Sequence, residues 1–199
     1  LLLTIFFLPE TLEYRAEKFR NIFDLGLDNL IKGLFIPKIG TLLMINFLIG
    51  TTFTIFTFAF QPYFINVLGQ NSDSLTLLFF TFGVLGVIIQ TVVISALNQK
   101  FDVVQILFIG LLIRSLSFIL MPIWPNIVYF VGVSILFSLF NSLVQPAINS
   151  LISLNAKPED QGTVLGLNSS YLSISNAVGP VIAGVLIFKN KPITYGYPL

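Results

Sequence analysis

The sequence predicts an all-α membrane protein, a polytopic bundle of transmembrane helices. Of its 199 residues, 55% are hydrophobic and 10% are charged, and the mean hydropathy is +0.92. An ordinary soluble domain has about 25% charged residues, so this chain lacks the polar side chains that would cover a water-soluble surface. Its apolar runs are more than twice as long as barrel strands of about 10 residues and do not alternate. Helices are therefore favoured over a β-barrel.

The chain opens with a short apolar segment followed by a long loop. Residues 1–8, LLLTIFFL, are expected to be the end of a transmembrane helix truncated upstream. Residues 9–38 are expected to form a cytoplasmic central loop. Within it, NIFDLGLDNLIKGLF mixes Ile, Leu and Phe with Asp24, Asp28 and Lys32, a pattern typical of a helix in the headgroup layer. The hydrophobicity of this stretch argues against a disordered linker.

The rest of the chain contains five segments long enough to cross a bilayer, which takes about 20 residues. They form a predicted five-helix bundle over 39–188, with spans at 39–62, 75–97, 103–121, 126–151 and 163–188. The separators carry turn and charge signals, and connections this short make neighbouring helices antiparallel. Residues 189–199 are expected to be an extracytoplasmic tail leading to a last helix outside this sequence. We interpret the whole as an internal piece of a longer polypeptide.

The distribution of Lys and Arg predicts the orientation, because short cytoplasmic loops are enriched in these residues. One side of the bundle carries Arg15, Lys18, Arg20, Lys32, Lys38, Lys100 and Lys157. The other side carries Lys189 and Lys191. The loops at 10–38, 98–102 and 152–162 are therefore expected in the cytoplasm, with the helices in the plasma membrane, the inner membrane of a bacterium.

Composition also argues against several classes of function. The net charge of +1 provides no concentrated basic face, so nucleic acid is not an expected partner. The chain has no Cys and no His, which removes thiol chemistry, the usual soft metal ligands and the commonest general base. No Asp or Glu lies within a complete span. We therefore expect no catalytic residue, metal site or cofactor, and an enzyme is the least favoured class.

The last span contains an unusual number of small and helix-breaking residues. GLNSSYLSISNAVGPVIAG, 166–184, has three Gly, one Pro, four Ser and two Asn. Small residues let helices approach closely in lipid. Pro180 leaves a carbonyl near Asn176 without its helical partner and bends a helix, and nearby Ser and Asn side chains can bond that carbonyl. Two interpretations stay open: tight packing alone, or a bent helix at the wall of an aqueous cavity.

The same stretch resembles a motif of the major facilitator superfamily. Its spacing is similar to the antiporter motif G, eight residues, G, three residues, G-P, two residues, G-G, and it comprises Gly166, Ser175, Gly179, Pro180, Ala183 and Gly184. Ser175 and Ala183 replace two glycines, and both are small. The motif belongs to the fifth helix of drug/proton antiporters, and its internal-repeat counterpart lies in the eleventh.

Three further stretches resemble this family in the same order. FFLPETL is similar to the end of the sixth helix in the drug-efflux branch, and QPAINSLIS, 145–153, to the inner half of the tenth. SALNQKFD, 95–102, resembles a degenerate copy of the cytoplasmic Asp-Arg-x-Gly loop motif, with Gln99, Lys100 and Asp102 at the Asp, Arg and Gly places. The missing acid argues against a charge-relay role for this loop. The resemblance implies the C-terminal half of a major-facilitator fold, from the end of the sixth helix through the eleventh.

The resemblance also implies which side chains face a central cavity, because helices seven, eight, ten and eleven line it in this family. The candidates are Asn46, Thr54, Thr57, Gln61, Gln90, Asn141, Gln145, Asn168 and Asn176. A polar side chain inside a bilayer must find a partner or water, so an interhelical hydrogen bond is the alternative for each. Phenylalanines crowd the first span, where they either make the cavity suitable for lipophilic substrates or face lipid.

Arg114 is the one charged residue well inside a complete span. It could snorkel outward or pair with a carboxylate from a part of the protein outside this sequence. The ninth helix is peripheral in the resembled fold, which favours a structural role for this arginine over a role in transport.

These observations together predict a secondary active transporter. The preferred hypothesis is proton-coupled efflux of small lipophilic compounds or drugs by alternating access, driven by the proton motive force. The expected partners are the lipid bilayer, a small-molecule substrate and the missing N-terminal half of the same chain, which would supply the titrating carboxylate. The alternatives are uptake of a sugar, an organic anion or another metabolite, and a membrane scaffold that transports nothing.

Overall fold

The computed structural model describes residues 27–189. Over this range the chain forms helices joined by short turns, with no strand among the described residues. Five of the described helices are long and apolar enough to cross a membrane. The predicted fold class, an all-α polytopic bundle, is therefore confirmed. The expected helix end at 1–8, the first part of the central loop and the tail at 190–199 lie outside the described residues.

The helices follow the predicted spans in order, with some shifts at their ends. They are α2 (Leu27–Leu34), α3 (Ile39–Pro62), α4 (Ser72–Ile88), α5 (Ile94–Asn98), α6 (Val103–Leu120), α7 (Ile127–Asn155) and α8 (Gln161–Lys189). Two π-helical turns extend this framework: Tyr63–Val67 continues α3, and Ile89–Val93 joins α4 to α5. The first span was expected to end at 62, but Pro62 does not stop it, because the wider π turn accommodates the residues that follow.

Polar residues in the separators begin the next helix. The Asn71 side chain accepts a hydrogen bond from the Ser74 backbone N–H at 2.9 Å, and Asn126 accepts two from the start of α7. Asp102 and Gln105 form a reciprocal capping box at the start of α6. Each side chain satisfies an N–H that the first helical turn leaves without a partner. These caps fix where the spans begin.

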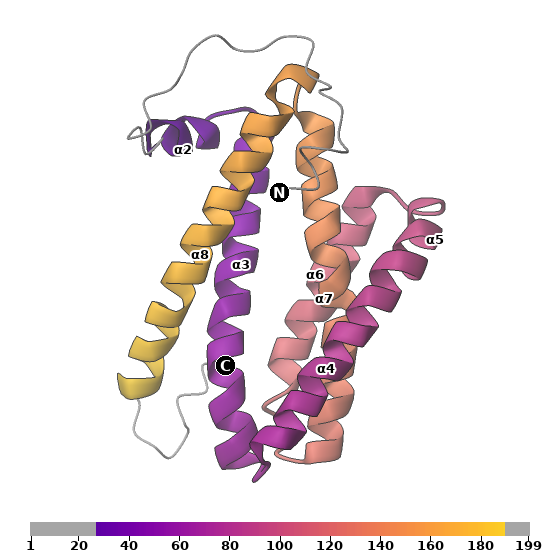
Figure 1. The fold of residues 1–199 in the computed structure, drawn as a ribbon, viewed down its shortest axis with the longest axis vertical. Coiled ribbons are helices and arrows are strands. Elements are labelled where there is room, and N and C mark those ends of the chain that lie inside the picture. The colour runs from indigo at the N-terminus through magenta and orange to yellow at the C-terminus, as the bar shows by residue number, and fades with distance from the viewer. Residues whose placement is uncertain (1–26, 190–199) are drawn as a thin grey trace, which may run out of the picture.

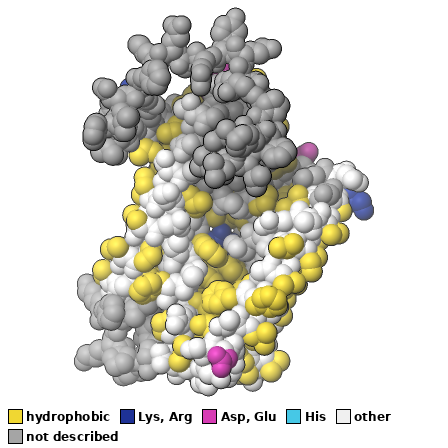
Figure 2. Space-filling model, viewed as in Figure 1, with side chains coloured by type: hydrophobic (Ala, Val, Ile, Leu, Met, Phe, Trp, Pro, Cys, Tyr) yellow, Lys and Arg dark blue, Asp and Glu magenta, His cyan; other side chains and the backbone are white. Residues whose placement is uncertain are grey.

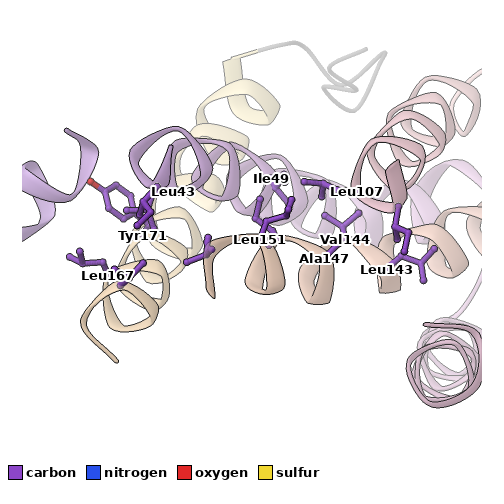
Figure 3. Close-up of a cluster of buried hydrophobic side chains, with 14 residues drawn as sticks. Leu43, Ile49, Leu107, Leu143, Val144, Ala147, Leu151, Leu167 and Tyr171 are labelled. Carbon is purple, nitrogen blue, oxygen red and sulfur yellow. The ribbon is translucent and has the colours of Figure 1, made fainter. Parts of the chain in front are cut away.

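The bundle packs mainly as two pairs of helices. Helix α3 lies along α8, and α6 lies along α7, while α4 packs against α7 (Figure 1). A buried aliphatic cluster that includes Leu43, Val144 and Ile148 joins the two pairs (Figure 3). An aromatic cluster around Phe60, Phe64 and Phe130 fills the end of the bundle where α3 finishes. The two clusters hold α3, α6, α7 and α8 around a common centre.

Helix α2 lies across the start of α3 and the first part of α8 (Figure 1). The Tyr171 hydroxyl donates a hydrogen bond to the Leu30 carbonyl at 2.7 Å, and Gly33 lies close to Leu167. Its other side exposes Ile31 together with Lys32, and Phe35 just after the helix is exposed as well. The helix expected within the central loop is therefore present, and its location in the headgroup layer stays a prediction.

Large apolar side chains cover much of the outer surface of the bundle (Figure 2). Leu77, Phe80, Phe108, Leu112 and Val128 are all exposed on it. In water such a surface would be unfavourable over so large an area, whereas in a bilayer it faces hydrocarbon. The helices therefore contact lipid along their outer faces.

Candidate functional site

The candidate polar residues fall into two cavities and one buried hydrogen-bonded chain. Thr54, Thr57 and Gln61 line a cavity along α3, whereas Asn141, Gln145 and Asn176 line a second cavity at the centre of the bundle. Asn46 and Asn168 are buried between helices. Gln90 is exposed in the π turn between α4 and α5 and lines neither cavity.

The first cavity, which we call the α3 cavity, has a volume of about 650 Å³. Its lining is Phe53, Thr54, Thr57, Phe58, Gln61, Pro62, Ile65, Asn66 and Pro180. The Thr54 and Thr57 hydroxyls donate to carbonyls one turn back in α3, at 3.0 and 2.9 Å. These hydroxyls are therefore already satisfied as donors, and the cavity presents a largely apolar wall with two amides.

The second cavity, which we call the central cavity, lies where α3, α6, α7 and α8 meet. Its volume is about 330 Å³, and its lining is Ile49, Gly50, Phe53, Arg114, Asn141, Val144, Gln145, Leu172 and Asn176. Phe53 also lines the α3 cavity, so the two cavities adjoin. Figure 2 shows a hollow in the middle of the face turned toward the viewer, with a Lys or Arg side chain at its base.

Arg114 reaches from α6 across to α3. Its side chain is 3% exposed, and Nη2 donates hydrogen bonds to the Ile49 carbonyl at 2.8 Å and to Thr52 Oγ1 at 3.3 Å. The guanidinium carbon lies 5.6 Å from the ring centroid of Phe53 and 5.4 Å from that of Phe118, within the range of cation–π attraction. Within residues 27–189, no carboxylate lies at salt-bridge distance from it.

This position contradicts one of the two roles suggested for Arg114, snorkelling, whereas pairing with a carboxylate outside this sequence stays a prediction. Snorkelling would direct the side chain outward to a helix end, but the guanidinium points into the bundle. The expectation that the ninth helix stays outside the cavity also needs correction. Helix α6 packs along α7, and its long arginine side chain reaches into the wall of the central cavity.

A chain of side-chain amides links α3, α8 and α7. Asn46 Nδ2 donates to Asn168 Oδ1 at 2.6 Å, and Asn168 Nδ2 donates to Asn149 Oδ1 at 2.9 Å. Gln145 Nε2 donates to the same Asn149 oxygen at 3.2 Å. Asn46 and Asn168 thus make the interhelical bonds that were the alternative to lining a cavity. The sequence reasoning missed Asn149, although its spacing of four residues from Gln145 places both on one face of α7.

The antiporter-like motif brings α8 against α3 at its central positions. A side chain at Gly179 would collide with Thr54 Oγ1, and one at Gly50 would lie 2.5 Å from Ser175 Oγ. Ser175 and Ala183 are buried, whereas a Cβ at Gly166 or Gly184 would meet nothing within 4 Å among the described residues. Pro180 lines the α3 cavity, and α8 continues through it as a helix to Lys189.

The cytoplasmic loop motif lies at the surface. Gln99, Lys100 and Asp102 are all exposed, and Asp102 caps α6 as described above. In the described part of the chain, no three His, Cys, Asp or Glu residues come together in a way that could hold a metal ion. The two cavities present one guanidinium, several amides and aromatic rings.

The comparison with protein families places most of the chain in one family. The family model described as Major Facilitator Superfamily matches residues 42–193, which is most of the chain. No curated protein matches this sequence.

Proposed function

The chain belongs to the major facilitator superfamily of membrane transporters, and we propose that it exports small lipophilic compounds by alternating access. The family and the five apolar helices make it an integral membrane protein that contacts lipid and moves a small-molecule substrate. The proposal adds the direction, the lipophilic substrate class, the drug/proton antiporter branch and the inner membrane of a bacterium as its location. It also assigns the proton motive force as the source of energy.

The central cavity is the observation that carries this proposal. Four helices contribute to it, and it combines amides with the Phe53 ring. Its volume of about 330 Å³ lies within the range of small-molecule sites, which runs from roughly 300 to 1,000 Å³. The adjoining α3 cavity adds Phe58 and Ile65. An apolar, aromatic wall with a few polar groups suits an amphipathic lipophilic compound.

The packing of α8 on α3 supports the alternating-access part of the proposal. Gly179 and Gly50 let the two helices approach until side chains on one touch the backbone of the other. The Thr54 hydroxyl also lies at hydrogen-bond distance from the Ser175 carbonyl on α8, to which it donates at 3.2 Å. Close packing of small residues produces a unit that moves as one body against the N-terminal half. Helices α3, α4, α6, α7 and α8 contain one acidic residue, Asp73 in the first turn of α4. This mechanism therefore places a titrating carboxylate at mid-membrane in that other half.

One observation favours a second candidate, uptake of an organic anion. The sequence placed no cationic side chain in the cavity, but the structure brings Arg114 into its wall. A guanidinium attracts carboxylates and phosphates. No comparable observation favours a sugar substrate or a membrane scaffold.

The proposal is tested by expressing the full gene in an efflux-deficient bacterial host and measuring accumulation of the lipophilic dye Hoechst 33342. We expect accumulation to fall relative to an empty vector and to return to the vector level when an uncoupler collapses the proton gradient. The same gene with Gly179→Leu serves as an inactive control at matched membrane abundance. Accumulation unchanged by the wild-type gene would contradict export, and a rise would favour uptake.

A further inference from the structure

Among residues 27–189, the positive charge of Arg114 has no neutralising partner. The side chain is 3% exposed, and its two hydrogen bonds go to neutral acceptors, the Ile49 carbonyl and Thr52 Oγ1. A charged residue in the middle of a membrane helix is costly unless it is paired. The two aromatic rings beside the guanidinium reduce this cost only in part.

The guanidinium N–H groups that make no hydrogen bond to α3 are directed toward the central cavity. An arginine has five N–H donors, and Nη2 alone makes the two hydrogen bonds. No guanidinium nitrogen of Arg114 is among the fully enclosed side-chain atoms that lack a hydrogen-bond partner in the described residues. Since Arg114 lines the central cavity, its remaining donors are accessible from that space.

Two neighbouring side-chain amides add further hydrogen-bond donors to those of Arg114. Asn141 and Asn176 line the cavity, and neither side chain makes a hydrogen bond to another described residue. Their NH₂ groups are free to donate. Phe53 adds an aromatic face beside the guanidinium. The cavity therefore offers one positive charge, neutral donors and an apolar wall.

We propose that the central cavity binds the carboxylate of a lipophilic monoanion, with Arg114 as the residue that pairs with it. A single guanidinium balances a single negative charge, and its planar fork matches the two oxygens of a carboxylate. A phosphate monoester would bring a second charge that nothing described in the cavity neutralises. This inference rests on the proposed function and names aromatic or aliphatic carboxylic acids as one substrate class of the central cavity.

The hydrogen bonds to α3 give Arg114 its orientation. Nη2 is held by Ile49 and Thr52, so the opposite edge of the guanidinium is the one presented to the substrate. Lysine carries the same charge but lacks the planar fork. Arg114→Lys should therefore keep part of the preference for an anion, whereas Arg114→Gln should lose it.

The test uses the full-length protein purified in detergent and two probes of nearly equal shape, 2-naphthoate and its neutral amide 2-naphthamide. Equilibrium binding is measured by isothermal titration calorimetry. We expect the wild type to bind naphthoate about ten-fold or more tightly than naphthamide, since a charge-assisted pair is worth at least that factor. Arg114→Gln should remove this difference. Lys157→Gln, which removes an exposed charge far from the cavity, should leave it unchanged.

Equal binding of the two probes to the wild type, or no binding of naphthoate, would overturn the inference. A carboxylate side chain elsewhere in the protein that already neutralises Arg114 would give this result. A preference that persists in Arg114→Gln would also overturn it. The wild-type comparison decides the question even if the Arg114 variants fail to fold. Dye export without any charge preference would contradict this inference alone, whereas the preference without dye export would contradict only the proposed function.

Discussion

Asn168 and Asn176 lie two turns apart on α8 and have different environments. Asn168 is buried and bonds to both Asn46 and Asn149, so it joins three helices. Asn176 is exposed to the central cavity and makes no side-chain hydrogen bond to a described residue. The first residue therefore holds the bundle together, and the second is available to a substrate.

This difference predicts that substitution by leucine affects stability at Asn168 but export at Asn176. Asn168→Leu should lower the free energy of unfolding by about 1 to 2 kcal/mol, because it removes two hydrogen bonds between membrane helices and leaves their partners unpaired. Asn176→Leu should leave stability nearly unchanged and reduce dye export. The measurements are the Tm of each purified variant in detergent and export at matched abundance. Equal Tm values for the two variants would contradict the assigned roles.

For single residues, the sequence indicated which polar side chains matter better than it indicated their hydrogen-bond partners. An amide in a bilayer needs a bond or water, so Asn46, Asn168 and Asn176 could all be singled out from the sequence. Which of them bonds to a neighbour depends on the rotation of α8 against α3, and no local pattern encodes that rotation. The inward orientation of Arg114 was not predicted either, because its acceptor Ile49 on α3 is 65 residues away in the chain.

At the scale of elements, the contact between α3 and α8 is the feature that the motif determines. Gly179 packs against Thr54, and Gly50 packs against Ser175. Gly184 is near the end of the same motif, but a Cβ there would meet no described atom within 4 Å. Of the three glycines in the motif, Gly179 is therefore required for this contact, whereas Gly166 and Gly184 are not.

Gly179→Leu should abolish transport while membrane insertion stays intact, because the larger side chain forces α8 away from α3. Gly184→Leu is the matched control and should keep the α3–α8 contact. In a Gly179→Ala background, Thr54→Gly should restore part of the export, since it removes the atoms that the new Cβ meets. Export by each variant is measured against its abundance in membranes. Full activity of Gly179→Leu would exclude a role for close packing there.

The helices themselves were largely predictable. Apolar runs of span length and the polar separators Asn71, Asp102 and Asn126 mark where α4, α6 and α7 begin. The π turns after Pro62 and around Gln90 were not foreseen, because they shift the backbone register without a distinctive change of composition. Gln90, which lies in the second of these turns, lines neither cavity, although it was expected to do so.

At the scale of the whole molecule, two helix pairs enclose a polar centre within an apolar exterior. Side chains bridge the pairs: Arg114 from α6 to α3, and the amides from α7 to α8 and α3. The outer faces carry large apolar residues. This distribution fits a bundle that meets lipid outside and an aqueous space inside. It is the arrangement that alternating access requires.

The central claim is that the central cavity is reached by water from one side of the membrane at a time. This sequence contains no Cys, so single cysteines can be introduced at Asn176, in the cavity, and at Leu112, on the exposed face of α6. In the full-length protein, with any Cys outside this sequence replaced, a membrane-impermeant methanethiosulfonate reagent should modify Asn176→Cys. It should not modify Leu112→Cys, because that position faces lipid.

The decisive measurement is the rate of this modification in membrane vesicles of each orientation, with and without a proton gradient. The account predicts that the reagent reaches Asn176→Cys from both sides, and that the gradient raises the rate from one side while lowering it from the other. An Asn176→Cys side chain that stays unmodified from both sides under every condition, in a protein that still exports dye, would contradict the account.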